Sequence, residues 1–320
     1  MKYHIAALVS FWYYRKENDL VRVREAADQG VRNGNHVSVM VDSGAFSADT
    51  QGHTITVTEY AQWLTDLARP ILGPHMTVAL NLDVLRDSTA SMRNWQRLRD
   101  QGHPTIPVTH LGDSATVLDA YAQHGVDYIA LGAMVGRSVA RKMRWAAHIH
   151  RHVHDHHPHV RLHGLGVGGQ KLVEALPWYS VDSSGFGSAY RYGALTLYDP
   201  IRRAFVRLRV SDKRTLHALG RMLRTHYGVT PAQLYTRTED NAVHRRIVLG
   251  VITRSILHWQ ASLQARRPVT PPASQRATGP LIHYALANGA EEERGVLPGP
   301  IIHFVDGSIT HVQQHLEHPA

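Results

Sequence analysis

The stretch VMVDSGAFSA, residues Val39 to Ala48, decides how the chain is read. Its first half is a β-branched apolar run, which is typical of a buried strand. The run stops at Asp42 and is followed by three residues, Ser-Gly-Ala, that are too small to fill a core. A similar stretch, SVDSSGFGSA, begins at Ser180. Strands that deliver a carboxylate beside cleared space indicate a chemical site at the strand ends.

Outward from this stretch, short β-branched runs alternate with amphipathic runs of helical length. The expected strands are His4–Ser10, His36–Asp42, Met76–Asp83, Thr105–His110, Tyr128–Gly132, Val160–Gly166 and Tyr179–Asp182. The expected helices are Asp19–Asn33, Thr58–Leu67, Ser88–Gln101, Ser114–His124, Arg137–His152 and Gln170–Leu176. Alternation at this spacing predicts parallel βα units, and seven of them favour a TIM-like (β/α)8 barrel over an open sheet.

Three regions follow from this reading. We expect a catalytic α/β barrel over residues 1–210, with Arg203–Val210 as either the eighth strand or a ribbon leading away. We expect a mainly helical extension over 211–265, packed on the barrel. Residues 266–320 read as a linker and tail, because Arg266–Pro280 is rich in proline and small polar residues.

The composition excludes several classes of protein. With no cysteine, the chain has no disulfide, cysteine nucleophile or thiolate zinc site. Its apolar runs are far shorter than a membrane span, and the first residues read as a strand rather than a signal peptide, so we expect a cytoplasmic protein with no membrane partner. The net charge of +9 suggests a polyanionic partner.

Three expected strands end in an aspartate: Asp42, Asp83 and Asp182. One such aspartate is more often the N-cap of the next helix than a catalytic group. Three of them, two followed by serine, favour a catalytic site over helix capping, because strand ends meet at one mouth of a barrel. Glycine-rich turns after two further strands, ALGAMVGR at Ala130 and HGLGVGGQ at His163, offer backbone N–H groups to an anion or carbonyl, or serve only as tight turns.

In their order, these motifs resemble the tRNA-guanine transglycosylase superfamily. The motifs are VDSGAF, NLDV, ALGAMVG, LHGLGVGG and VDSSGFGSAYRYGALTLYD, and together they cover about half of the chain. The resemblance implies exchange of guanine for a 7-deazaguanine base such as preQ0 by double displacement at C1′ of a nucleotide. It implies Asp182 as the nucleophile and Asp42 as the group that carries protons to and from the bases.

The resemblance also implies a base-binding pocket. Asp83 would accept hydrogen bonds from the purine edge, and the backbone at Gly132 and Ala133 would face O6. Phe46 and Leu165 would stack on the ring. The remaining implied contacts are His110, which stands where the family has a glutamine, and Ser43, which either contacts the base or caps the next turn.

One departure from the family decides the expected partner. The tRNA enzymes carry a Cys3His zinc site after the barrel, and this chain has no cysteine to form it. We therefore expect no zinc or other cofactor, and the chain is more similar to the zinc-less DNA-guanine transglycosylase branch of phages and bacteria. Base exchange in tRNA remains an alternative, as does a basic nucleic-acid-binding barrel with a decayed site.

Basic residues supply candidate contacts to a nucleic-acid backbone, although a solvated helix face is the commoner role for any one of them. The candidates are Arg137, Arg141, Lys142, Arg144, Arg191, Arg202 and Arg203. The histidine-rich run HIHRHVHDHHPH, His148 to His159, sits at an expected helix end away from the strand termini, so the sequence does not favour a functional metal there. Nothing in the sequence determines the oligomeric state.

Overall fold

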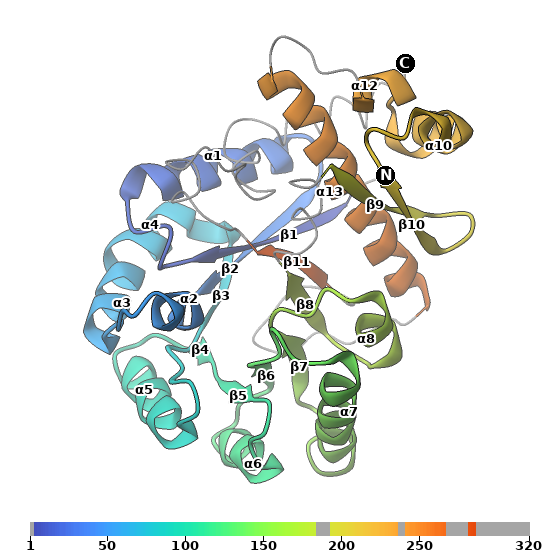
Figure 1. Ribbon diagram of the computed structural model, residues 1–320. Helices are drawn as coiled ribbons and strands as arrows, with labels where there is room; N and C mark the ends of the chain where they lie inside the picture. The colour runs from blue at the N-terminus through green and yellow to red at the C-terminus, as the bar shows by residue number, and fades with distance from the viewer. Residues whose placement is uncertain (1–2, 184–192, 236–240, 267–280, 286–320) are drawn as a thin grey trace.

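The computed structural model describes residues 3–183, 193–235, 241–266 and 281–285, and its main feature is a nine-stranded sheet (Figure 1). The strands are β1 (His4–Ser10), β2 (His36–Asp42), β3 (Met76–Leu80), β4 (Thr105–Ile106), β5 (Val108–His110), β6 (Tyr128–Gly132), β7 (Arg161–Gly164), β8 (Ser180–Ser183) and β11 (Leu281–Ala285). Their order is β4-β3-β2-β1-β11-β8-β7-β6-β5, and the described pairs are parallel. The predicted parallel α/β class is therefore confirmed.

The two ends of this strand order belong to one extended segment. β4 and β5 are separated only by Pro107, which has no N–H to donate to a ladder. The carbonyl of Pro107 accepts a hydrogen bond from the N–H of Ala130 in β6, and the carbonyl of Ile106 accepts one from the N–H of Asn81 after β3. The hydrogen-bonded order therefore returns to the segment from which it started.

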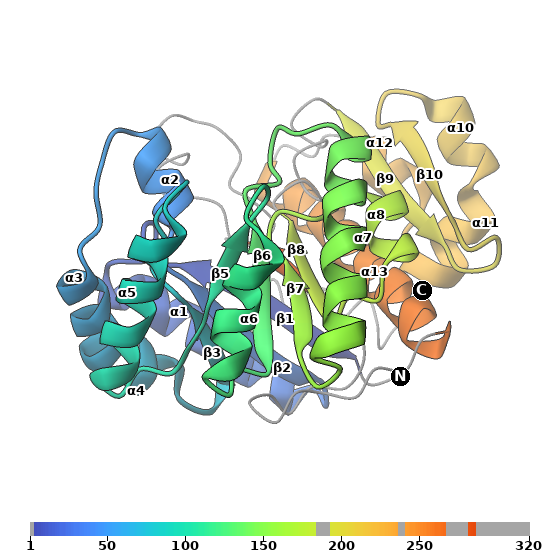
Figure 2. The same ribbon diagram turned by 90° about the horizontal axis from the view of Figure 1, so that it is seen from below.

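Helices lie outside the strands, as Figure 1 shows, and run back in the opposite direction (Figure 2). They are α1 (Glu17–Arg32), α2 (Ala45–Thr50), α3 (Val57–Trp63), α4 (Arg69–Leu72), α5 (Ser88–Asp100), α6 (Ala115–Gln123), α7 (Val139–His156) and α8 (Gln170–Ala175). Local signals set their starts: the Thr56 side chain and Glu59 form a capping box at α3, and Ser114 caps α6. The helix expected from Thr58 begins one residue earlier, at Val57.

Strand alternation divides the apolar side chains into two clusters. In β2, Val39 and Val41 join the large core between strands and helices. Met40 joins a smaller inner cluster, whose members come from the strands or directly precede one: Ala6, Leu8, Met40, Leu80, Ile106, Val108, Tyr128, Ala130 and Tyr179. Because side chains alternate faces along a strand, Asp42 shares the inner face with Met40.

A ribbon and a set of helices follow β8. The strands β9 (Ala194–Asp199) and β10 (Ala204–Arg209) pair antiparallel in a sheet of their own. The helices are α10 (Lys213–Ala218), α11 (Gly220–Met222), α12 (Pro231–Tyr235) and α13 (Asn241–Arg266). α13 packs against β9 and reaches back to the sheet, because Nε2 of Gln260 donates to the carbonyl of His4 at 2.8 Å.

The strand between β1 and β8 comes from a different part of the chain than the sequence suggests. Of the two roles foreseen for Arg203–Val210, the structure has the ribbon, and β11 occupies the place between β8 and β1. β11 comes from the segment that reads as linker and tail, so a boundary at residue 210 leaves one strand of the sheet out. The sequence misses it because its five residues are held by two parallel neighbours far away in the chain, which no local pattern reveals. Within the described residues, no helix combines the length and apolarity needed to cross a bilayer.

Candidate active site

The carboxyl ends of the strands bring the three predicted aspartates together. Asp42 ends β2, Asp83 follows β3 by three residues, and Asp182 lies in β8. The charges of Asp83 and Asp182 both act on Asp42. Three segments from separate parts of the chain therefore place the carboxylates of Asp83 and Asp182 within electrostatic range of Asp42.

The carboxyl of Asp42 is strongly perturbed by its surroundings. Burial raises the pKa of Asp42 to about 7, and the charges of Asp83 and Asp182 add to this, while hydrogen bonds from the backbone N–H groups of Gly44 and Ser43 partly oppose it. A carboxyl that is half protonated near neutral pH can both give and take a proton.

Gly44 makes the turn that brings these two N–H groups to Asp42. Its φ of 73° lies in the left-handed region, and an added Cβ would collide with Oγ of Ser10 and Cβ of Trp12. Ser43 is fully buried, and its Oγ accepts a weak hydrogen bond from the N–H of Ala45 at 3.4 Å. The contact joins Ser43 to the first residue of α2, whose N-cap is Gly44 and has no side-chain cap hydrogen bond.

Asp182 is held by one group of β7 and by one in the turn that follows this strand. Its Oδ1 accepts the N–H of Gly166 at 3.0 Å and lies 3.2 Å from Nε2 of His163. The other ring nitrogen of His163, Nδ1, lies 2.6 Å from Oγ of Ser180. That oxygen in turn lies 2.5 Å from the hydroxyl of Tyr128. His163 and Ser180 have no exposed surface. A buried chain of polar groups therefore fixes the imidazole that faces Asp182.

Asp83 is paired with His110, at the end of β5. Nε2 of His110 lies 2.7 Å from Oδ2 of Asp83, and only 5% and 13% of their side chains are exposed. Burial lowers the pKa of His110, but the hydrogen bond and charge of Asp83, with the charge of Asp113, outweigh this and the pKa is raised. The backbone N–H of His110 also donates to Oδ2 of Asp113 at 2.8 Å.

The predicted base-binding residues differ in their surroundings: some adjoin one another, whereas Phe46 lies exposed on α2. Gly132 ends β6, and a Cβ there would approach Cδ2 of His110 at 3.3 Å and Cδ1 of Leu165 at 3.5 Å, so these three residues adjoin. Ala133 follows with a φ of 57°, which is rare for a residue with a side chain and marks a strained turn. Leu165 packs against the inner cluster, whereas Phe46 lies on α2 and is 46% exposed.

The predicted backbone contacts are exposed where the structure describes them. Arg137 lies in the loop after β6, and Arg141, Lys142 and Arg144 lie in the first two turns of α7; all but the partly buried Lys142 are exposed. Arg202 and Arg203 lie in the turn between β9 and β10 and are also exposed. Arg191 and the rest of the Asp182 motif, residues 184–192, lie outside the described residues.

Ser180 and Tyr128 are the site residues that sequence reasoning missed. Strand alternation was the available signal: Ser180 lies two residues before Asp182, and Tyr128 lies four before Gly132, so each shares a strand face with a predicted site residue. His163, the first residue of the HGLGVGGQ stretch, also belongs to the site through its contact with Asp182.

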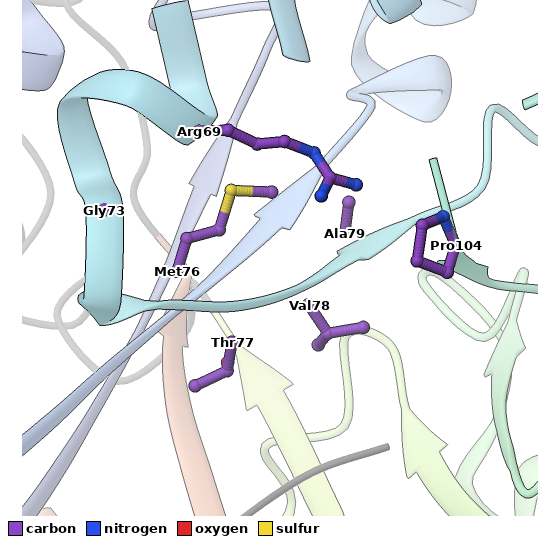
Figure 3. A pocket seen from close by; sticks show the side chains of 7 residues that line it. All are labelled: Arg69, Gly73, Met76, Thr77, Val78, Ala79 and Pro104. Atoms are coloured by element: carbon purple, nitrogen blue, oxygen red, sulfur yellow. The ribbon is translucent and has the colours of Figure 1, made fainter. Parts of the chain in front are cut away.

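One cavity lies away from these groups. It has a volume of about 270 Å³ at the amino-terminal end of β3, and Figure 3 shows its lining of Arg69, Gly73, Met76, Thr77, Val78, Ala79 and Pro104. Its lining contains none of the three aspartates. We therefore place the candidate site at the carboxylates and not in this cavity.

Comparison with known proteins assigns no family. No protein-family model matches the sequence, and no curated protein matches it. Among solved structures, the chain has a TM-score of 0.29 and 11% identity with a Coccidioides immitis protein assigned as a fructose-1,6-biphosphate aldolase, and 0.25 and 12% with the YdjI aldolase from Escherichia coli K12. Each match covers 98% of this chain and 89% of the other. Likeness this distant carries no functional argument.

Proposed function

We propose that the chain is a base-exchange glycosyltransferase that replaces guanine in DNA with a 7-deazaguanine base. The observation that carries the proposal is the convergence of Asp42, Asp83 and Asp182, with the pKa of Asp42 raised to about 7. One carboxyl suited to proton transfer and one held by fixed donors match the two roles that double displacement at an anomeric carbon requires.

The fold proposed for this site is a closed (β/α)8-type barrel. Its support is the strand order, which begins and ends in the segment around Pro107 and has β11 between β8 and β1. With β4 and β5 counted as one strand, eight parallel strands point their carboxyl ends to the same mouth. Catalytic residues in such barrels come from the ends of several strands, as here.

The first half of the reaction forms a covalent intermediate. Asp182 attacks C1′ of the nucleotide, the bond from C1′ to N9 of guanine breaks, and the leaving base takes a proton from Asp42. Oδ1 of Asp182 is in contact with the N–H of Gly166 and with Nε2 of His163, so we assign Oδ2 as the attacking atom. The sugar is then an ester of Asp182, and Asp42 is ionised.

The second half returns both carboxyls to their starting states. The incoming 7-deazaguanine loses its N9 proton to Asp42, and N9 attacks C1′ and displaces Asp182 with net retention. Asp83 accepts hydrogen bonds from the base edge, and His110 holds Asp83 in place from the neighbouring strand. Gly132 and Leu165, which adjoin each other, would contact the base from one side.

DNA is proposed as the substrate because the chain is basic and lacks the cysteines of the tRNA enzymes' zinc site. Exposed arginines at 137, 141, 144 and 202 lie in loops or a helix start near strand ends, where they would contact phosphates. An enzyme acting on a base within a duplex must flip it out of the stack.

The test offers labelled guanine with duplex DNA, single-stranded DNA or tRNA to the full chain and to D182N and D49N. Asp49 is exposed on α2 and serves as the matched carboxylate outside the site. We expect incorporation into DNA by the wild type and D49N and none by D182N. Incorporation into tRNA alone would reject DNA as the substrate, and no incorporation into any nucleic acid would reject base exchange.

A further inference from the structure

Three side chains from two helices converge on the outside of the sheet. Asp119 lies on α6, His152 lies near the end of α7, and His157 directly follows α7. Nε2 of His152 lies 2.6 Å from Oδ1 of Asp119, and Nε2 of His157 lies 2.7 Å from the same oxygen. Two imidazoles from one helix end therefore point at one carboxylate oxygen that is more than thirty positions away in the chain.

The donor atoms lie close together and have the chemistry of a metal-ligand set. The three ligand atoms lie within 4.8 Å of one another, and no other group of this kind occurs in the part of the chain that the structure describes. Two imidazole nitrogens and a carboxylate oxygen are ligands that zinc accepts, with water as the fourth. Their side chains are 17–26% exposed, so an ion can enter from solvent without unfolding.

The ligands stand on a fixed scaffold. Ile149 and Val153 are buried on α7 beside His152 and anchor this face of the helix. His156 stacks on His152 with 4.4 Å between ring centroids, and its Nδ1 lies 3.0 Å from the carbonyl of His152. The His152 ring is therefore constrained before any ion binds, which separates this cluster from a flexible histidine run.

The cluster is remote from the carboxylates of the candidate active site. α7 begins after the carboxyl end of β6 and ends before the start of β7, and Figure 2 shows it running opposite to the strands beside it. His157 is four residues from the start of β7, at the amino-terminal side of the sheet. An ion here would join α6 to the end of α7 and would take no part in chemistry at the other end.

We propose that Asp119, His152 and His157 form a binding site for a divalent transition-metal ion, with zinc as the ion tested first, and that the ion clamps the end of α7 to α6. The competing explanation is that the three groups make only hydrogen bonds and ion pairs, and that histidines of the run bind metal adventitiously. Asp119 separates the two, because adventitious binding to a histidine run does not need a carboxylate on another helix.

The experiment titrates the full chain, stripped of metal, with Zn²⁺ by calorimetry. We expect one site in the wild type, and affinity reduced about tenfold or more in D119N, H152Q and H157Q, because each loses a ligand. H154Q is the matched control: His154 lies in the same run, is exposed and is outside the cluster. Its affinity should stay within about twofold of the wild type, since its ligand set is intact.

A second readout does not depend on the absolute affinity. An ion that binds the folded chain raises the melting temperature by mass action, so Zn²⁺ should raise it in the wild type and H154Q but not in D119N. The histidine variants keep the test valid if D119N folds poorly. Equal Zn²⁺ affinity in D119N and the wild type, or no stoichiometric binding by the wild type, would overturn the proposal.

Discussion

Nε2 of His110 lies 2.7 Å from Oδ2 of Asp83, although His110 ends β5, Asp83 follows β3, and the two are 27 positions apart. The pair joins the end of β5 to the segment after β3. β5 and β4, on either side of Pro107, are the last and first strands in the order of the sheet. A histidine paired with a carboxylate in this way holds the carboxylate in one orientation. In the proposed reaction, this orientation determines how Asp83 meets the edge of the base.

Replacing His110 tests this pairing through stability. The pKa of His110 is raised above its ordinary 6.5, so the stability that the pair contributes is complete below pH 6.5 and is lost as pH rises through the folded-state pKa. The difference in unfolding free energy between wild type and H110Q should therefore be largest below pH 6.5 and shrink above it. Denaturant unfolding across this range measures it, and a difference that grows with pH would contradict the pairing.

Asp42 should show a dependence on pH that a neutral replacement removes. Its pKa rises from 3.8 unfolded to about 7 folded, so the stability associated with its proton is complete below pH 3.8 and is lost as pH rises towards 7. The stability of D42N relative to wild type should increase over this interval by up to about 4 kcal/mol, since each pKa unit is worth about 1.4 kcal/mol. Denaturant unfolding measures the difference between D42N and wild type, and a difference that does not change with pH would reject the raised pKa.

Gly44 should tolerate no side chain. G44A places a Cβ against Ser10 and Trp12 and shifts the N–H groups that bind Asp42, so we expect lost exchange activity and a stability loss of roughly 3 kcal/mol. G52A is the matched control, because Gly52 has the same φ of 73° with no atom within 4 Å of an added Cβ. Its cost should be only the left-handed strain of about 1–2 kcal/mol. Equal losses of stability in G44A and G52A would contradict the claim that close packing around Gly44 excludes a side chain.

The buried chain behind Asp182 should affect the rate more than binding. S180A removes the partner of Nδ1 of His163, so we expect the rate of glycosyl transfer to fall about tenfold, which corresponds to about 1.4 kcal/mol, with little change in KM. Y128F removes only the outer hydroxyl and should have a smaller effect. Single-turnover rates measure both, and an unchanged rate with a raised KM in S180A would assign Ser180 to binding instead.

Much of the site could be predicted because it depends on strand ends. The bounds of β1, β2 and β6 match their predicted ranges, and a strand that ends in an aspartate places that side chain at the mouth whatever its neighbours are. The contacts of His110 with Asp83, and of His163 with Asp182, depend on which strands are adjacent. Local sequence does not contain that information, and for the same reason β11 was read as tail.

The most direct test of the central claim is capture of the covalent intermediate on DNA. The full chain is incubated with DNA, denatured without incoming base, and examined for DNA that stays attached to protein. We expect an adduct at Asp182 in the wild type and D49N, located by mass spectrometry of the proteolysed chain, and none in D182N. An adduct in D182N, or one mapped to another residue, would contradict the assignment of Asp182 as the nucleophile.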